Sequence, residues 1–297
     1  MALRMYLSNN DGVRPWVGRT ARPSRAWVRR IARLGRLDQV GLALLGVISA
    51  AMVVVPWVVP HGSLDNVGVS FAKPGSAGLL LGTDEQSRDL LSRVLLGMRT
   101  TWFAALLVIA SGIVIGGIIG LVAGMAGGWV DAILMRITDV FLALPGPLLA
   151  LAVVSALGAS LAHTLEAVML VWWPFYARIV RGEVRSIMSR SHVEAARMGG
   201  SKRLGLAIRH VLPGTIGPVL VTASLDIGAL ILTLAGLSFL GLGSPAPAAE
   251  LGAMSARGLT YLLTKWWVPV MPSIGVFILV FVANVAGDAV RDLAEQS

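Results

Sequence analysis

No cysteine occurs among the 297 residues of this chain. Disulfide bonds and cysteine-ligated metal centres are therefore excluded. Charged residues are scarce as well, at 14% of the chain, against roughly 25% in soluble domains. Together with a hydrophobic content of 56% and a mean hydropathy of +0.76, this scarcity is typical of a protein that lies within a lipid bilayer.

Two patterns that carry catalysis are also missing. No Gly-Lys is followed by Ser or Thr, so the phosphate-binding loop of ATPases is absent. The histidines, His61, His163, His192 and His210, form no His-Glu-x-x-His pair. His163 and Glu166 stand three residues apart, as metal ligands do, but such a pair without further ligands is more often structural. We therefore expect no enzyme active site and no metal or cofactor bound by this chain.

Long uncharged runs are what the sequence has in abundance. Residues 40–59, 101–130 and 266–287 contain no charged residue. Each run is long enough to cross a hydrocarbon core of about 30 Å as a helix, which satisfies every backbone hydrogen bond without water. The alternative, buried core helices of a large soluble enzyme, is disfavoured by three such runs in one chain.

The hydropathy pattern predicts an all-α polytopic membrane protein with six transmembrane helices and both termini in the cytoplasm. Pro145 and Pro147 predict a kink or a loosened helix in the third span, and Trp172-Trp173-Pro174 interrupts the fourth. The six expected spans cover about residues 38–59, 100–124, 132–157, 162–180, 214–240 and 266–288.

The basic residues predict the orientation. Nine arginines precede the first span, and residues 178–209 hold eight basic against two acidic residues, whereas residues 60–99 hold four of each. By the positive-inside rule, the amino-terminal tail and the loop at 181–213 lie in the cytoplasm. We interpret residues 1–37 as a basic cytoplasmic tail with an interfacial helix, and residues 38–297 as the transmembrane domain. Arginines beside a span predict contact with membrane lipid and no nucleic-acid partner.

The polar segment before the second span contains candidate gate residues. Capping-box spacing predicts a helix that begins at Thr83. On that helix, Asp84 with Arg88 and Asp89 with Arg93 stand four residues apart and can pair. Asp84, Arg88 and Asp89 are either gate residues or the paired charges of a solvated helix.

Two features of the spans allow more than one interpretation. A glycine every four residues from Gly112 to Gly128 predicts close approach of another helix, with passage of substrate along the row as the alternative. Asp226 lies inside the fifth span, where a carboxylate costs roughly 2.5–3.5 kcal/mol unless it faces protein or a wet cavity. It either bonds a neighbouring helix or lines a pore.

The cytoplasmic loop at 181–213 predicts two short helices joined at a glycine corner. Ser191 and Glu194 have capping-box spacing, Gly200 follows as a helix terminator, and Ser201 can cap the second helix. Pro213 closes the segment before the fifth span. A compact basic helix pair at the end of a membrane domain is typical of a docking surface.

The residues of this loop carry a resemblance to a known family. The spacing of Glu-Ala-Ala, glycine and His-x-Leu-Pro resembles the coupling loop of bacterial ABC importer permeases, on Glu194, Ala195, Ala196, Gly200, His210, Leu212 and Pro213. Residues 81–93, 237–243 and 287–292 resemble segments of the dipeptide, oligopeptide and nickel-type permeases. Ser87, Gly214 and Leu234 depart from the family pattern, which usually has Gly, Asn and Glu there.

The resemblance implies a type I importer permease in the bacterial cytoplasmic membrane. Its implied partners are a second homologous permease, two ATPase subunits that hold ATP and magnesium, and an extracytoplasmic solute-binding protein. Peptides are the first cargo that we expect, and nickel or another small solute is the alternative. An ion-coupled secondary transporter, which would need inverted repeats with matched broken helices, and a membrane enzyme are the competing classes.

The charge asymmetry makes a testable prediction about topology. A single cysteine at Ser201 should be shielded from an impermeant thiol reagent in intact cells, because that loop is expected in the cytoplasm. A single cysteine at Ser76 should react. Since the chain has no cysteine of its own, equal labelling of the two variants would contradict the six-span arrangement.

Overall fold

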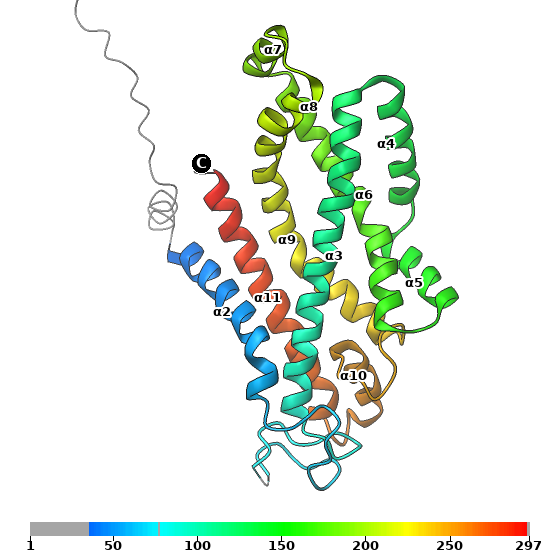
Figure 1. The fold of residues 1–297 in the computed structure, drawn as a ribbon. Coiled ribbons are helices and arrows are strands. Elements are labelled where there is room, and N and C mark those ends of the chain that lie inside the picture. Colours follow the sequence, from blue (N-terminus) through cyan, green and yellow to red (C-terminus); the bar gives the residue numbers. More distant parts are fainter. Residues whose placement is uncertain (1–35, 77, 296–297) are drawn as a thin grey trace, which may run out of the picture.

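The computed structural model describes residues 36–76 and 78–295, and nearly all of the regular structure in this part of the chain is helical (Figure 1). Within these residues the β-structure is limited to isolated bridges. The all-α prediction is therefore confirmed. The predicted tail lies outside the described residues, except that its last two residues belong to the first helix.

The helices are α2 (Arg36–Val58), α3 (Leu90–Ala126), α4 (Gly128–Ala143), α5 (Gly146–Leu157), α6 (Leu161–Met188), α7 (Ser191–Met198), α8 (Arg203–Leu206), the π-helix η1 (Ala207–Val211), α9 (Leu212–Phe239), α10 (Leu251–Gly258), the 3₁₀-helix η2 (Leu259–Tyr261) and α11 (Trp267–Glu295).

Four of the helical segments are long and apolar enough to cross a membrane: Gln39–Val58, Leu90–Ala126, Arg203–Phe239 and Trp267–Ala294. The bent pair of α4 and α5 would make a fifth span if it is counted as one. The helix at the predicted fourth span, α6, has 28 residues but carries Glu166 and several arginines. The six-span count and the side on which the termini lie therefore stay predictions.

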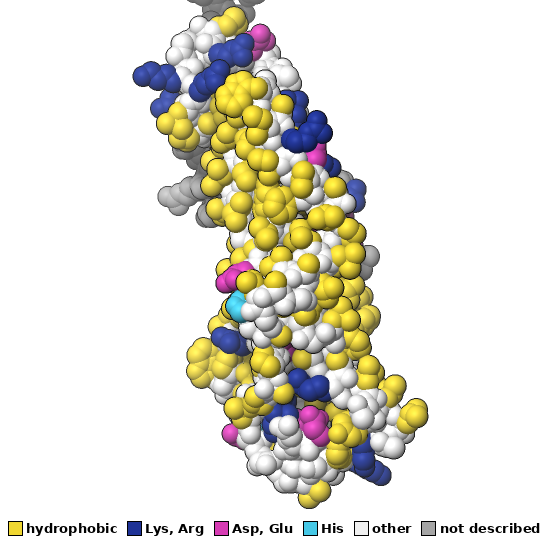
Figure 2. All heavy atoms as spheres, turned by 90° about the vertical axis from the view of Figure 1, so that its right-hand side faces the viewer, with side chains coloured by type: hydrophobic (Ala, Val, Ile, Leu, Met, Phe, Trp, Pro, Cys, Tyr) yellow, Lys and Arg dark blue, Asp and Glu magenta, His cyan; other side chains and the backbone are white. Residues whose placement is uncertain are grey.

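The surface fits a protein that spans a bilayer. Figure 2 shows hydrophobic side chains covering much of the middle of one face, while most of the visible Lys and Arg side chains lie toward the two ends. Large apolar side chains such as Ile118, Phe277 and Phe281 are exposed on the helices. In water such exposure would be costly, whereas in lipid these side chains are already in an apolar solvent.

The third predicted span is broken rather than kinked. Its two halves, α4 and α5, meet at an angle of 84°. Leu144 is extended, with φ −95° and ψ 139°, because the residue before a proline is disfavoured in the helical region. Pro145 is the N-cap of α5, and Pro147 stands in its first turn, where a missing N–H costs nothing. The two prolines thus end one helix and start the next.

The glycine row of α3 lies against α6, as the packing interpretation predicts. A Cβ built at Gly112 would stand 2.9 Å from the ring of Tyr176, and one at Gly120 would stand 2.5 Å from the carbonyl oxygen of Ala177. Gly116 and Gly124 meet α6 equally closely. The last glycine of the row, Gly128, has no such neighbour, because the chain turns there into α4.

Helices α9 and α11 also pack closely at glycines. A Cβ at Gly228 of α9 would lie 2.6 Å from the amide nitrogen of Asn284, and one at Gly287 of α11 would lie 2.9 Å from the carbonyl oxygen of Ser224. Trp102 of α3, Leu230 of α9 and Leu279 of α11 are fully buried in the shared core. The core therefore lies among α3, α6, α9 and α11, with α7 and α8 at one end and α10 at the other (Figure 1).

The contact between α3 and α6 predicts a stability difference between two neighbouring glycines. Gly120→Val should lower the free energy of unfolding by about 1–3 kcal/mol, because the new side chain overlaps the backbone of α6. Gly117→Val is the matched control, since a Cβ there has no neighbour within 4 Å. Thermal unfolding of the purified protein in detergent measures both, and equal midpoints would contradict the close approach.

Candidate functional site

The short helix α7 stands at one end of the molecule, beyond the bundle (Figure 1). Val193 is buried and anchors it, whereas Glu194 and Ala195 are exposed, Ala196 is half-buried and Met198 is 80% exposed. The predicted serine caps are wrong. The N-cap of α7 is Arg190, whose carbonyl accepts from Val193 N and Glu194 N, so Ser191 is already inside the helix.

The glycine corner after α7 forms as predicted. Gly200 has φ +84°, the left-handed conformation that glycine adopts at little cost. Ser201 N donates to the carbonyl of Ala196 at 3.1 Å, and Gly200 N donates to that of Arg197 at 3.1 Å. These two bonds form a Schellman motif, which satisfies the last carbonyls of the helix. Ser201 thus closes the first helix instead of capping the second, whose N-cap is Lys202.

His210, Leu212 and Pro213 form the link from this corner to α9 rather than a face of α7. Pro213 lies in the first turn of α9 and has no N–H to donate. Just before it, the chain widens into the π-helix η1, in which Leu212 N bonds the carbonyl of Ala207. The ring of His210 lies 6.2 Å from that of His192, so the link does touch α7. The structure therefore brings the predicted loop residues into one compact unit.

An ion cluster that the sequence analysis missed joins α4 to α6. Asp131 is 5% exposed and accepts hydrogen bonds from Arg181 and Arg185, with Arg181 Nη2 at 2.7 Å from Oδ2. One turn of α6 earlier, Arg178 bonds Asp139 at 2.6 Å. The pattern that could have revealed the cluster is the spacing of three arginines on one helical face opposite two aspartates eight residues apart.

The segment from Thr83 to Asp89 is not a helix, contrary to the prediction. The Thr83 hydroxyl donates to the carbonyl of Val69 and accepts from Ala72 N, both at 2.8 Å. Because it bonds these residues of the preceding loop, it does not cap a helix. Helix α3 instead begins at Leu90, with Asp89 as its N-cap. Ser87, where the resembling family usually has glycine, has φ +62°.

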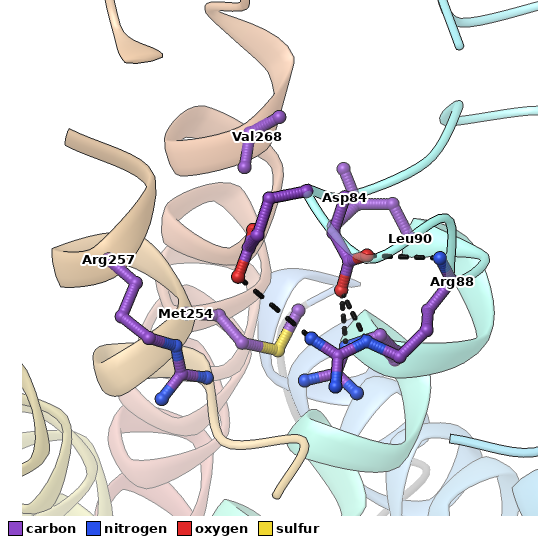
Figure 3. Close-up of a pocket in the computed structure, with 8 residues that line it drawn as sticks. Asp84, Arg88, Leu90, Met254, Arg257 and Val268 are labelled. Carbon is purple, nitrogen blue, oxygen red and sulfur yellow. Dashed lines mark hydrogen bonds and ion pairs between the residues drawn. The ribbon is translucent and has the colours of Figure 1, made fainter. Parts of the chain in front are cut away.

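The candidate gate residues Asp84, Arg88 and Asp89 are buried, and Figure 3 shows Asp84 and Arg88 bonded to each other. Asp84 Oδ2 lies 2.7 Å from Arg88 Nε and 3.4 Å from Arg93 Nε. Arg93 also donates to the carbonyls of Pro247 and Ala248, in the loop that precedes α10, at 3.2 Å. The predicted ion pair between Asp89 and Arg93 does not form, because Asp89 caps α3 and Arg93 pairs with Asp84. This arrangement ties together the segment before α3, α3 itself and the approach to α10.

Asp226 stands apart from both ends, in the middle of α9. Trp172 Nε1 and Tyr176 Oη of α6 donate to its Oδ2, at 2.5 and 3.2 Å. Asp226 therefore does bond a neighbouring helix, as one of the two interpretations predicts. Its role as a pore residue stays a prediction. In the part of the chain that the structure describes, no three His, Asp or Glu side chains gather as metal ligands do.

Comparison with known proteins gives one family. Residues 112–297 match the family described as "binding-protein-dependent transport system inner membrane component". A probable D,D-dipeptide transport system permease protein, DdpC of Escherichia coli, is 39% identical, and the alignment covers 82% of each chain. A glutathione transport system permease protein, GsiD of Pectobacterium atrosepticum, is 36% identical, over 91% of this chain and 90% of that protein.

Solved structures give the same architecture. The methionine ABC transporter MetNI, in an inward-facing conformation, is similar with a TM-score of 0.53 at 23% identity, over 69% of this chain and 97% of that chain. An amino acid ABC transporter has the same TM-score at 14% identity, over 70% of this chain and 95% of that chain. At these identities the likeness establishes the fold.

The ion cluster between α4 and α6 predicts unequal effects of removing its two acids. Asp131→Ala should lower the free energy of unfolding by about 1–2 kcal/mol, because it leaves Arg181 and Arg185 without their carboxylate, although water reaches both arginines. Asp139→Ala, which removes an exposed partner of Arg178, should cost less than about 0.5 kcal/mol. Thermal unfolding in detergent compares them, and a larger loss at Asp139 would contradict this account.

Proposed function

This chain belongs to the family of binding-protein-dependent transport system inner membrane components, the permeases of ABC importers, and on that premise we propose that its cargo is a peptide. It is a membrane permease whose family works with ATPase and substrate-binding components. Relatives that are 36–39% identical to it are named for D,D-dipeptides, glutathione and di- and tripeptides, and these cargoes share the peptide bond. This agreement supports a short peptide as the cargo.

The proposed assembly places this chain beside a second homologous permease, so that the two enclose the path across a bacterial cytoplasmic membrane. Two ATPase subunits, with their ATP and magnesium, contact the cytoplasmic end, and a solute-binding protein contacts the opposite end. The exposed basic residues near α7, including Arg190, Arg197 and Lys202, support a cytoplasmic location for that end. Both termini are then cytoplasmic.

The single observation that carries the coupling role is the geometry of α7 and its glycine corner. The Schellman bonds around Gly200 hold α7 beyond the end of the bundle. Glu194 and Ala195 are exposed there, and the small alanines allow another protein to approach closely. We assign this face to the groove of an ATPase subunit. Movement of α7 is then transmitted to α9 through α8 and the π-helix η1, which form one continuous helical segment with α9.

The opposite end has a different role in this proposal. Asp84, Arg88 and Asp89 are between 2% and 4% exposed. Arg88 bonds Asp84 and also reaches the carbonyl of Pro247 in the loop before α10, at 3.5 Å, whereas Asp89 caps α3. Paired and buried charges of this kind resist rearrangement, because separating them would leave a charge without a partner. We therefore assign these residues to a rigid outer rim of the path rather than to a moving gate.

The corner predicts the outcome of a transport assay. Gly200→Val should leave the helices inserted, but it places a β-branched residue at φ +84°, a local strain on the order of 1–2 kcal/mol, and so turns α7 away from the ATPase. In proteoliposomes that contain the whole transporter, binding protein and ATP, the wild type should take up labelled dipeptide. The variant should bind the ATPase weakly and lose at least about nine-tenths of that uptake.

The neighbouring glycine supplies the control. Gly199→Val should keep most of the uptake, because Gly199 has φ −71° and a Cβ there makes only ordinary contacts. Normal uptake by Gly200→Val would remove the coupling role from this loop. A wild-type transporter that moves no peptide, but does move another solute such as nickel, would refute the peptide assignment.

A further inference from the structure

Asp226 lies at the midpoint of α9, 14 residues after Leu212 and 13 before Phe239. At a rise of about 1.5 Å per residue, either end of the helix is about 20 Å away. The carboxylate is thus far from both ends of this apolar helix. What surrounds its two oxygens decides what it faces.

One oxygen is held by α6 and the other is open. Trp172 Nε1 and Tyr176 Oη both donate to Oδ2, at 2.5 and 3.2 Å. Among the residues that the structure describes, no donor bonds Oδ1, and the side chain is only half-buried. Since hydrocarbon offers no hydrogen-bond donor, Oδ1 needs water or a donor from outside this chain.

Asp226 belongs to a stripe of small and polar residues along α9. The stripe recurs at alternating spacings of four and three, which keep it on one helical face, and consists of Thr222, Asp226, Ala229, Thr233 and Gly236. All five positions are exposed or half-exposed. A face turned to lipid carries large apolar side chains, as α11 does at Phe277 and Phe281. The stripe on α9 instead presents small and polar side chains on an exposed or half-exposed face.

The stripe continues into a groove between α9 and α5. Thr233 and Gly236 of the stripe line this groove together with Pro147, Leu148 and Leu151. Thr233 lies seven residues from Asp226, which is about 10 Å along the helix. A carboxylate oxygen and an apolar wall therefore share one face, and a molecule with a cationic end and apolar side chains matches both.

We propose that this face of α9 lines the translocation path and that Oδ1 of Asp226 accepts a hydrogen bond from the protonated amino terminus of a peptide in transit. The inference rests on the proposed function and adds a cargo-contacting residue to it. Trp172 and Tyr176 hold the carboxylate in place, so that Oδ1 is already oriented when the ammonium group arrives. A single charge-assisted bond is strong enough to attract the cargo and weak enough to release it.

The first test separates charge from helix packing in the reconstituted transporter. Asp226→Asn keeps an amide oxygen for Trp172 and Tyr176 but removes the charge, and Asp226→Glu keeps the charge. ATP hydrolysis stimulated by the binding protein should stay near the wild-type rate in both. Dipeptide uptake per ATP should fall about tenfold in Asp226→Asn and less than about threefold in Asp226→Glu. Asp139→Asn, which removes an exposed carboxylate from α4, should leave the ratio unchanged.

The outcomes distinguish this inference from the function on which it rests. A wild-type transporter without ATP-dependent peptide uptake overturns both. With wild-type uptake established, an unchanged ratio in Asp226→Asn overturns the inference alone. So does a parallel loss of uptake and ATP hydrolysis, because Asp226 would then serve coupling or assembly instead of cargo.

The second test reports whether water and negative charge are present at this face. In the assembled transporter, Ala229→Cys should react with water-soluble thiosulfonate reagents, the cationic one about tenfold faster than the anionic one. Adding Asp226→Asn should abolish that preference. Phe277→Cys, on the exposed apolar face of α11, should stay unlabelled. Mass spectrometry of this chain measures the labelling of each variant. An unreactive Ala229→Cys would show that lipid or a partner subunit covers the stripe, and would overturn the proposal.

Discussion

The approach of α6 to the glycine row of α3 determines where the other functional parts of the bundle lie. Backbone and Cβ atoms of Trp173, Tyr176 and Ala177 lie where side chains of α3 would otherwise be. Between helices in lipid there is no hydrophobic driving force, so contact of this kind depends on van der Waals packing over bare backbone. Once α6 is held there, its remaining faces carry Arg181 toward α4 and Trp172 toward α9.

The two ends of the molecule use charge in opposite ways. At the α7 end the charges are mostly exposed, and the backbone is held by the Schellman corner at Gly200. At the α10 end, Asp84, Arg88 and Arg93 are buried and paired with one another, and Arg93 also donates to carbonyls of the loop before α10. The first arrangement leaves a surface that another protein can bind, and the second makes a stiff frame. In the proposed function, the first surface contacts the ATPase and the second forms the rigid outer rim of the path.

Local signals in the sequence predicted those features whose cause is also local. The glycine corner was predicted because a left-handed residue is needed wherever a Schellman motif forms, and Gly200 provides it. The row of glycines in α3 predicted close packing because bare backbone on one helical face has few other uses. The start of α3 at Thr83 was wrong, since the hydroxyl of Thr83 bonds Val69 and Ala72, fourteen and eleven residues earlier in the chain. Capping-box spacing gives no information about such a competing partner.

The sequence by itself determined that this chain is helical, membrane-embedded and a permease of ABC importers, because hydropathy, charge asymmetry and the loop motif are properties of the order of residues. Only the tertiary structure decided that Asp131 joins α4 to α6, that Arg93 pairs with Asp84 instead of Asp89, and that one oxygen of Asp226 is held by α6 while the other is open. The physical reason is the same in each case. The partner of a buried charge is chosen by which helices pack together, and that choice depends on contacts between residues far apart in the chain.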